Sequence, residues 1–430
     1  MAMQSITGKH VGDTYYDLTH SSGLKVLIYP KENCHSTYAV FGTRYGSVDN
    51  CFHRTDQATV QTVPEGIAHF LEHKLFESED GDAFARYAKT GASANAYTSF
   101  DMTCYLFSCT EKVEESLEIL LDFVQSPYFT KETVEKEQGI IGQEIRMYDD
   151  DPQWRVMFNL LGALYHTHPV RVDIAGTVES IAEITPELLY QCYHTFYHLP
   201  NMALCIAGDI NKETVLRLVD QYCKKGEEFA VERVFEAEPR EIVKNRVTQA
   251  LSVATPLFQF GFKEQASKER KTVKELACTE LLLEILANEG SPLFARLQER
   301  NLINESSFQY EFFEGPGYAA TVFAGESKDP QAVADEILQE VARLRQEGID
   351  KEAFTRAQKA LYGRNVASLN SAETVANALI SFCFAQRELF AYIDALAEVT
   401  LEEVSACLKT HLLEEYAALS VIEPMEEKRA

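Results

Sequence analysis

The stretch HFLEH brings two histidines and a glutamate into five residues, His69 to His73. Side chains at positions i and i+4 of a helix project side by side, so the imidazoles of His69 and His73 can bind one tetrahedral zinc ion. Glu72 lies beside the second histidine and one turn from His69, where its carboxylate can reach a water on the metal rather than the metal itself. A structural zinc site is closed, whereas a catalytic one keeps a position open for water.

The residues around this pentapeptide predict a helix over 64–76. Thr62 and Glu65 have the spacing of a capping box, and Pro64 is tolerated in a first turn. At 100° per residue the helix has one apolar stripe, and the two histidines and Glu72 gather on the opposite face. The stripe comprises Ile67, Phe70, Leu71 and Leu75. The alternative is that the histidine face is an ordinary solvated face of an amphipathic helix.

Zinc needs a third protein ligand, and a second predicted helix over 130–148 offers one. Glu137, Ile141 and Glu144 fall on a single face of that helix, together with Val134 and Tyr148. Two carboxylates within an apolar stripe are costly to bury unless they are paired or bound to metal. The alternative is an exposed acidic helix, because Glu132, Glu135 and Asp149 lie nearby.

HFLEH, followed by Glu137 and Glu144, resembles the inverted-zincin metallopeptidases of the pitrilysin, insulin-degrading enzyme and mitochondrial processing peptidase family. The signature of that family is HxxEH followed some seventy residues later by a glutamate. Glu144 lies 71 positions after His73, since 144 − 73 = 71. The resemblance also includes the blocks GIAHFLEHKLFE, GASANAYTSFDMTCY and PNMALCIAGDI, and it covers essentially the whole chain.

The resemblance implies a role for each of these residues. His69, His73 and Glu144 match the zinc ligands, and Glu72 matches the general base that takes a proton from a zinc-bound water. Glu137 matches the acid that orients a ligating histidine. The implied function is that of a zinc-dependent endopeptidase acting on peptides or unfolded segments inside a clamshell chamber.

Asn95 and Ala96 begin a stretch that resembles the substrate-pairing edge strand of the family. An extended peptide would add there as a further strand, held by main-chain hydrogen bonds. The alternative for Asn95 is a turn residue that opens a strand.

The order of predicted elements indicates an α+β fold. NMALCIAGDI near the end of the first half is echoed by YAALSVIEP near the end of the second. We therefore expect two homologous αβ halves, each a mainly antiparallel sheet with helices packed on it, as in the mitochondrial processing peptidase-like metallohydrolase fold that the resemblance implies. The expected divisions are a zinc-binding domain at 1–224, a polar connector at 225–245 and a second domain at 246–430 without the zinc motif. Single long strands are predicted at 95–109 and 249–263.

The formal net charge of −26 argues against nucleic acid or an anionic membrane surface as a partner. The N-terminus lacks an apolar signal core, and no apolar run has the length of a membrane span. Ten cysteines are scattered without a CxxC pair. A reducing cytoplasm is the simplest expectation.

Active family members carry an arginine and a tyrosine, seven residues apart, in the second half, where they hold the substrate and steady the oxyanion. The matching stretch here, LFARLQERNLINESS (293–307), puts Gln298 and Glu305 at those positions. A glutamate would repel an oxyanion. Either Arg296 or Arg300 substitutes from a shifted register, or another chain supplies the donors. We therefore expect a homologous second subunit in a heterodimer, with a homodimer as the alternative.

Two other classes of protein are alternatives to a peptidase. The first is a non-catalytic scaffold or assembly subunit of the same fold; such chains typically lose the pentapeptide that this one keeps. The second is a di-iron carboxylate protein, which needs Glu-x-x-His motifs on two helices, and the sequence contains no such pair.

Overall fold

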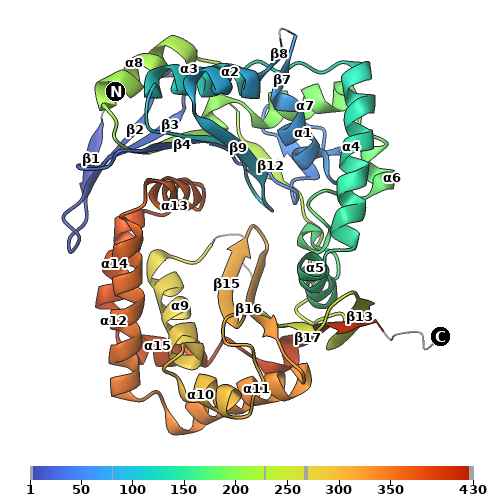
Figure 1. Ribbon diagram of the computed structural model, residues 1–430, viewed down its shortest axis with the longest axis vertical. Helices are drawn as coiled ribbons and strands as arrows, with labels where there is room; N and C mark the ends of the chain where they lie inside the picture. Colours follow the sequence, from blue (N-terminus) through green and yellow to red (C-terminus); the bar gives the residue numbers. More distant parts are fainter. Residues whose placement is uncertain (1–2, 80, 227–228, 266–269, 426–430) are drawn as a thin grey trace. The chain divides into compact units, whose positions relative to one another are not determined.

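The computed structural model describes residues 3–79, 81–226, 229–265 and 270–425 (Figure 1). The chain forms two compact units, which are treated separately below. Unit 1 comprises Met1–Ile145, Asp173–Val234 and Asn365–Asp394; unit 2 comprises Arg146–Val172, Phe235–Arg364 and Ala395–Ala430. Each unit contains one mainly antiparallel sheet with helices packed on it, which confirms the predicted α+β class.

The main sheet of unit 1 has seven strands in the order β1-β2-β3-β11-β4-β10-β9. Only β3 and β11 run parallel; the other neighbours are antiparallel. Helices cover both faces at the centre of the sheet, so every residue of β4 and β11 is buried. The strands are β1 (Gln4–Thr7), β2 (Thr14–Thr19), β3 (Lys25–Pro30), β4 (Thr37–Thr43), β9 (Ser93–Thr98), β10 (Thr103–Cys109) and β11 (Met202–Gly208).

Figure 1 shows helix α3 on one face of this sheet and helix α13 on the other. Smaller paired strands complete the unit: β5 (Cys51–Arg54), β6 (Gln61–Thr62), β7 (Glu77–Ser78), β8 (Gly81–Asp82) and β12 (Val231–Arg233). Its helices are α1 (Ile67–Leu75), α2 (Ala83–Thr90), α3 (Val113–Phe123), α4 (Lys131–Asp149, which ends in unit 2), α6 (Val178–Ile181), α7 (Pro186–Phe196), α8 (Lys212–Tyr222) and α13 (Ala372–Phe384).

Helix α1 begins later than predicted, and the capping-box interpretation is wrong. Thr62 pairs with Cys51 in a short strand, so it is unavailable as a cap. The helix begins after Gly66, whose φ of 85° is left-handed and strains any residue with a Cβ. A Cβ there would also lie 2.3 Å from the carbonyl oxygen of Ala175.

The predicted strand 95–109 is a hairpin of two strands. β9 and β10 pair antiparallel with Thr98 opposite Thr103, and Ser99 N–H donates to the Met102 carbonyl at 2.8 Å to close the turn. The predicted strand 249–263 likewise divides into β13 (Arg246–Leu251) and β14 (Leu257–Lys263). Alternation of side chains continues through a tight turn, so strand periodicity alone does not locate these breaks.

The main sheet of unit 2 repeats the central order of unit 1. Its five strands run β13-β17-β14-β16-β15, with β13 and β17 parallel and the others antiparallel. Taken in this sheet order, they match β3, β11, β4, β10 and β9 of unit 1 one for one. The remaining strands are β15 (Gln309–Gly315), β16 (Tyr318–Glu326) and β17 (Ala417–Pro424). The duplication is therefore visible in strand order as well as in sequence.

The helices repeat in the same way. Adding 220 to the bounds of α5 (Pro152–Leu164) gives those of α13, and adding 220 to the first residue of α4 gives the first residue of α12 (Lys351–Ser368). The other helices that lie wholly or partly in unit 2 are α9 (Val273–Ala287), α10 (Pro292–Glu299), α11 (Pro330–Glu347), α14 (Leu389–Glu398) and α15 (Leu401–Leu408).

The compact units differ from the predicted division at 224 and 245, because the two equivalent helices are exchanged. α5 packs on β14 and β17 of unit 2, and α13 packs on β4 and β11 of unit 1. Equivalent glycines allow the close approach. A Cβ on Gly42 would lie 2.7 Å from Ile380 of α13, and one on Gly261 would lie 2.7 Å from Leu160 of α5. Each sheet is thus covered on one face by a helix from the other half of the sequence.

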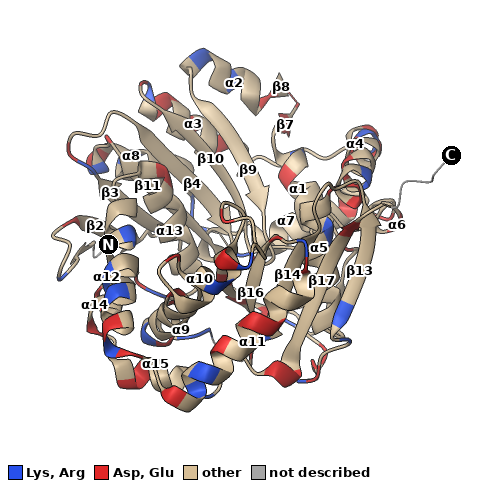
Figure 2. Ribbon diagram, turned by 60° about the horizontal axis from the view of Figure 1, so that its bottom comes forward, with Lys and Arg blue, Asp and Glu red and all other residues tan. Residues whose placement is uncertain are grey.

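Charged residues of both signs are interleaved along helices such as α4 (Figure 2). No helix of the described part of the chain combines the length and hydropathy needed to cross a bilayer.

The predicted connector contains a buried ionic clamp at Glu238. Its carboxylate accepts hydrogen bonds from the backbone N–H groups of His166, Thr167 and His168 at 2.8–2.9 Å and from Lys263 at 2.5 Å. Burial alone would raise the pKa of Glu238, but the Lys263 ammonium and the three amides outweigh it and lower the pKa to about 2. The clamp joins the connector to β14 and to the segment after α5, all within unit 2.

Replacement of Glu238 by Gln is expected to destabilise the protein by about 2–4 kcal/mol at pH 7, because it leaves the buried Lys263 without a countercharge. A depressed carboxyl pKa stabilises the fold above the unfolded value of 4.5, and this contribution is lost as the pH falls towards about 2. In urea denaturation, the difference in the free energy of unfolding between wild type and Glu238→Gln should therefore be about 1–2 kcal/mol smaller at pH 3.5 than at pH 7. Glu241→Gln, which removes an exposed carboxylate nearby, is the control. An equal effect of both substitutions would contradict the clamp.

Candidate metal centre

Helices α1 and α4 bring the predicted metal ligands together in unit 1. The apolar stripe of α1 is buried as predicted, and so are Val134, Glu137 and Ile141 of α4. His69 is only 8% exposed and Glu137 only 6% exposed, so both the solvated-face and the exposed-helix alternatives are wrong.

His69, His73 and Glu144 each offer one ligand atom, and these three atoms lie within 4.8 Å of one another. The Nε2 of His69 is 3.8 Å from one Glu144 oxygen, and the Nε2 of His73 is 3.5 Å from the other. Zinc bonds of 2.0–2.2 Å in a tetrahedron place neighbouring ligand atoms roughly 3.3–3.5 Å apart. The donor set and its spacing therefore fit a zinc ion.

Glu137 fixes the orientation of His73. The Nδ1–H of His73 donates to Glu137 at 3.0 Å, which leaves the Nε2 lone pair directed to Glu144. A carboxylate behind a ligating imidazole sets its tautomer and raises its basicity. His69 has no such partner: its buried Nδ1 has no hydrogen bond within the described chain. Glu137 lies where an orienting acid is required.

The electrostatics separate the two histidines. Burial and, secondarily, the neighbouring His73 together lower the pKa of His69 to about 3, so His69 is neutral at pH 7. Burial alone would also lower the pKa of His73, but the Glu137 hydrogen bond and the nearby carboxylates of Glu144 and Glu72 outweigh it and raise the pKa. The site thus attracts positive charge, which a divalent cation can supply.

Glu72 lies beside the cluster and is held by Thr98 of β9. Its Oε2 accepts from the hydroxyl of Thr98 at 2.6 Å. Burial raises the pKa of Glu72, the Thr98 hydroxyl and His73 lower it, and Glu144 raises it, with a net shift upward. A carboxylate with a raised pKa is a stronger base, which suits a group that accepts a proton from water.

Asn95 and Ala96 lie inside β9, which starts at Ser93, so the turn alternative for Asn95 is wrong. β9 is the last strand of the seven-stranded sheet and pairs on one side with β10. Within the described residues, its other edge has no strand partner in that sheet. Asn95 is exposed, and its side-chain oxygen accepts from the Ala96 N–H at 2.9 Å.

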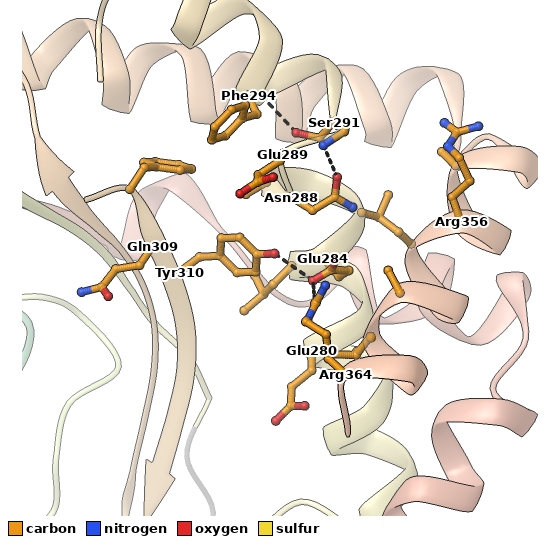
Figure 3. A pocket seen from close by; sticks show the side chains of 18 of the residues that line it. Glu280, Glu284, Asn288, Glu289, Ser291, Phe294, Gln309, Tyr310, Arg356 and Arg364 are labelled. Atoms are coloured by element: carbon orange, nitrogen blue, oxygen red, sulfur yellow. Dashed lines mark hydrogen bonds and ion pairs between the residues drawn. The ribbon is translucent and has the colours of Figure 1, made fainter. Parts of the chain in front are cut away.

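The equivalent position in unit 2 carries an ion pair in place of the metal ligands. Glu144 corresponds to Arg364, since 364 − 144 = 220, the offset that relates α4 to α12. There Glu284 of α9 accepts hydrogen bonds from Arg364 and, at 2.8 Å, from Tyr310 of β15. Figure 3 shows both side chains converging on Glu284 at the wall of a cavity of about 910 Å³. A guanidinium at this position repels a metal cation.

The stretch 293–307 offers no free arginine to replace the missing pair. Arg296 bonds to Glu336 at 3.0 Å and to Glu340 at 2.8 Å, and Arg300 pairs with Glu336 as well. Gln298 donates to Glu305 at 2.7 Å, so the two residues at the arginine and tyrosine positions bond to each other. Both arginines are engaged by carboxylates of α11.

Thr98 is a functional candidate that sequence reasoning did not identify. Strand alternation places it on the same face of β9 as Ala96, three residues after Asn95. The motif and the strand are read separately in the sequence, so nothing there indicates that this hydroxyl meets Glu72. The contact depends on how α1 packs against β9.

The chain is similar to known proteins over almost its whole length. Residues 61–178 match the family described as insulinase (peptidase family M16), and residues 183–361 match the peptidase M16 inactive domain. The chain is 40% identical over 415 residues to the protein named uncharacterized zinc protease YmfH from Bacillus subtilis (strain 168). That alignment covers 95% of this chain and 96% of the relative.

Solved structures show the same relationship. An M16-like peptidase from Alicyclobacillus acidocaldarius superposes with a TM-score of 0.91 at 36% identity, over 99% of both chains. Pitrilysin superposes with a TM-score of 0.77 at 15% identity, over 99% of this chain and 47% of pitrilysin, and this likeness concerns the fold alone. The chain belongs to peptidase family M16, the insulinase family.

Proposed function

We propose that this chain is a zinc-dependent endopeptidase that hydrolyses peptides or unfolded segments. The observation that carries the proposal is the group of three ligand atoms from His69, His73 and Glu144 within 4.8 Å, with the carboxylate of Glu72 beside it. Relatives named zinc proteases support the metal and the reaction class. A scaffold of the same fold would have no use for a buried base next to an intact ligand set.

Different residues of the chain would bind the metal, transfer the proton and orient a ligand. His69, His73 and Glu144 would hold the zinc ion, which when bound lowers the pKa of the attacking water towards ~7 and polarises the scissile carbonyl. Glu72 accepts the proton of the water and returns it to the leaving amine. Glu137 keeps the His73 imidazole in the ligating orientation.

β9 is the proposed docking strand, and the substrate would pair with the edge of β9 that faces away from β10. A peptide in extended conformation would pair with the main chain near Asn95 and Ala96, while its side chains alternate outward. This mode of binding requires an unpaired strand, which a folded globular substrate seldom exposes. The proposed substrate class is therefore unstructured polypeptide.

We further propose that a homologous second subunit supplies the donors that steady the oxyanion. The support is that Arg296 and Arg300 are both paired to carboxylates, while Gln298 and Glu305 bond to each other. A heterodimer with a chain that carries the arginine–tyrosine pair would complete the site. We also propose a cytoplasmic location, supported by ten cysteines that are all free thiols.

The purified protein is expected to bind one zinc ion per chain. His73→Ala and Glu144→Gln should each lose most of the metal, because two ligands hold zinc poorly. Glu280→Gln, a substitution on α9 beside the equivalent site of unit 2, is the control and should keep one zinc per chain. Elemental analysis of the dialysed proteins is the measurement. Full zinc content in both ligand variants would refute the assignment.

Glu72→Gln is expected to keep zinc and fold but to lose peptidase activity. The amide preserves the shape of the side chain but cannot accept the proton, and removal of a general base commonly slows a reaction by about 10²–10⁴. The loss can be larger here because the same group acts twice. Steady-state cleavage of a fluorogenic peptide, with zinc content and circular dichroism in parallel, is the test. A variant that cleaves near the wild-type rate would exclude Glu72 as the base.

The chain alone is expected to cleave peptides poorly, and addition of a homologous chain that carries the arginine–tyrosine pair should restore turnover. The physical reason is that a site without oxyanion donors loses on the order of 10²–10³ in rate. Full turnover by the isolated chain, unchanged by Arg296→Ala or Arg300→Ala, would contradict both the partner and the shifted-register explanations.

A further inference from the structure

Thr98 is the one residue that connects the proposed docking strand to the proposed base. It is the last residue of β9, and its hydroxyl donates to the Oε2 of Glu72 at 2.6 Å. No other side chain in the described part of the chain donates a hydrogen bond to Glu72, and the backbone N–H of the same Thr98 adds to the hydroxyl in lowering the pKa of this carboxyl. A bond of this length to a carboxylate is among the stronger hydrogen bonds in proteins.

The position of this hydroxyl is fixed by the sheet. Thr98 pairs with Thr103 across the hairpin, and the two hydroxyl oxygens are 3.3 Å apart. Thr103 is fully buried and donates its own proton to the Tyr45 carbonyl at 2.8 Å. The donor that reaches Glu72 is therefore anchored to β10 and to the loop after β4, and does not depend on a freely rotating surface side chain.

The bond leaves Glu72 with one oxygen for chemistry. Oε2 is engaged by the Thr98 hydroxyl, and no other side chain in the described part of the chain donates to this carboxylate. A carboxylate held through one oxygen keeps one rotamer, so the other oxygen presents its lone pairs in one direction. A base that must meet a water within about 3 Å gains from such restriction, because misplacement by 1 Å can cost about 10²-fold in rate.

We propose that Thr98 is the positioning residue of the general base, and that it fixes Glu72 relative to the strand on which the peptide docks. Thr98 lies two residues beyond Ala96 on the same strand. A peptide paired to β9 is thus registered to the same main chain that holds the base. The inference rests on the proposed peptidase function and adds to it the element that aligns base with substrate.

The test compares Thr98→Val, which keeps shape but removes the donor, with Thr98→Ser, which keeps the donor. Thr37→Val is the matched control: Thr37 is buried in the same sheet, and its hydroxyl donates to the Asp209 carbonyl at 2.8 Å, away from the site. All variants are assayed for zinc content, kcat and KM under conditions in which wild type cleaves a fluorogenic peptide.

Thr98→Val is expected to lower kcat by about 10- to 100-fold, with zinc content and KM within about twofold of wild type, because a hydrogen bond to a charged group is lost. Thr98→Ser should recover most of kcat, and Thr37→Val should leave it unchanged. A Thr98→Val enzyme with wild-type kcat would overturn the inference, and so would a loss of kcat that Thr98→Ser fails to recover.

A double-mutant cycle separates positioning from general structural support. In a Glu72→Gln background no base remains to be positioned, so Thr98→Val should add less than about twofold to the loss already present. Equal effects of Thr98→Val in both backgrounds would show that the threonine acts through stability. Zinc-dependent turnover by wild type that Glu72→Gln slows by about 10²–10⁴ tests the proposed function by itself, so failure of either proposal can be told from failure of the other.

Discussion

The hydrogen bond between His73 and Glu137 is the contact on which the rest of the site depends. It is a polar contact between α1 and α4, and it is short enough to fix a tautomer. Burial of an imidazole and a carboxylate is tolerated because each satisfies the other. Once that pair is fixed, the second nitrogen of His73 faces Glu144, and His69, one turn earlier, faces the same carboxylate. The arrangement of the three candidate ligand atoms thus depends on one partly buried hydrogen bond.

The two units show how one architecture can carry opposite electrostatics. At the position where α4 offers Glu144, α12 offers Arg364, and the carboxylate of Glu284 meets a guanidinium. In unit 1 the carboxylates leave room for a bound cation, which is the proposed zinc ion. In unit 2 the positive charge is supplied by the side chain of Arg364. Strand order, helix offsets and even the equivalent glycines under the exchanged helices are preserved. The same strand order and helix packing are therefore compatible with either arrangement of charges.

The sequence predicts those parts of the candidate site whose positions follow from the regular spacing of residues along a helix. The faces of α1 and α4 follow from helical spacing, so the three candidate ligand residues and Glu137 lie on the faces where the sequence places them. The start of α1 is not predicted, because Gly66 takes a left-handed conformation set by contact with Ala175, more than a hundred residues away. Thr98 is missed for the same reason: its partner is fixed by how a helix packs on a strand. The exchange of α5 and α13 is likewise a tertiary event that no local pattern encodes.

That exchange has a consequence for how the protein is made. The sheet of unit 1 is assembled from residues up to Gly208, but the helix that covers one face of it is α13, which begins at Ala372. On the ribosome, α1 and α4 can form early. The apolar residues of β4 and β11 that pack against α13 stay exposed on that face until most of the chain has been synthesised. Folding of unit 1 is thereby tied to synthesis of the segment that contains α13. A truncated chain would present an open hydrophobic sheet, which is the kind of surface that chaperones and quality-control proteases recognise.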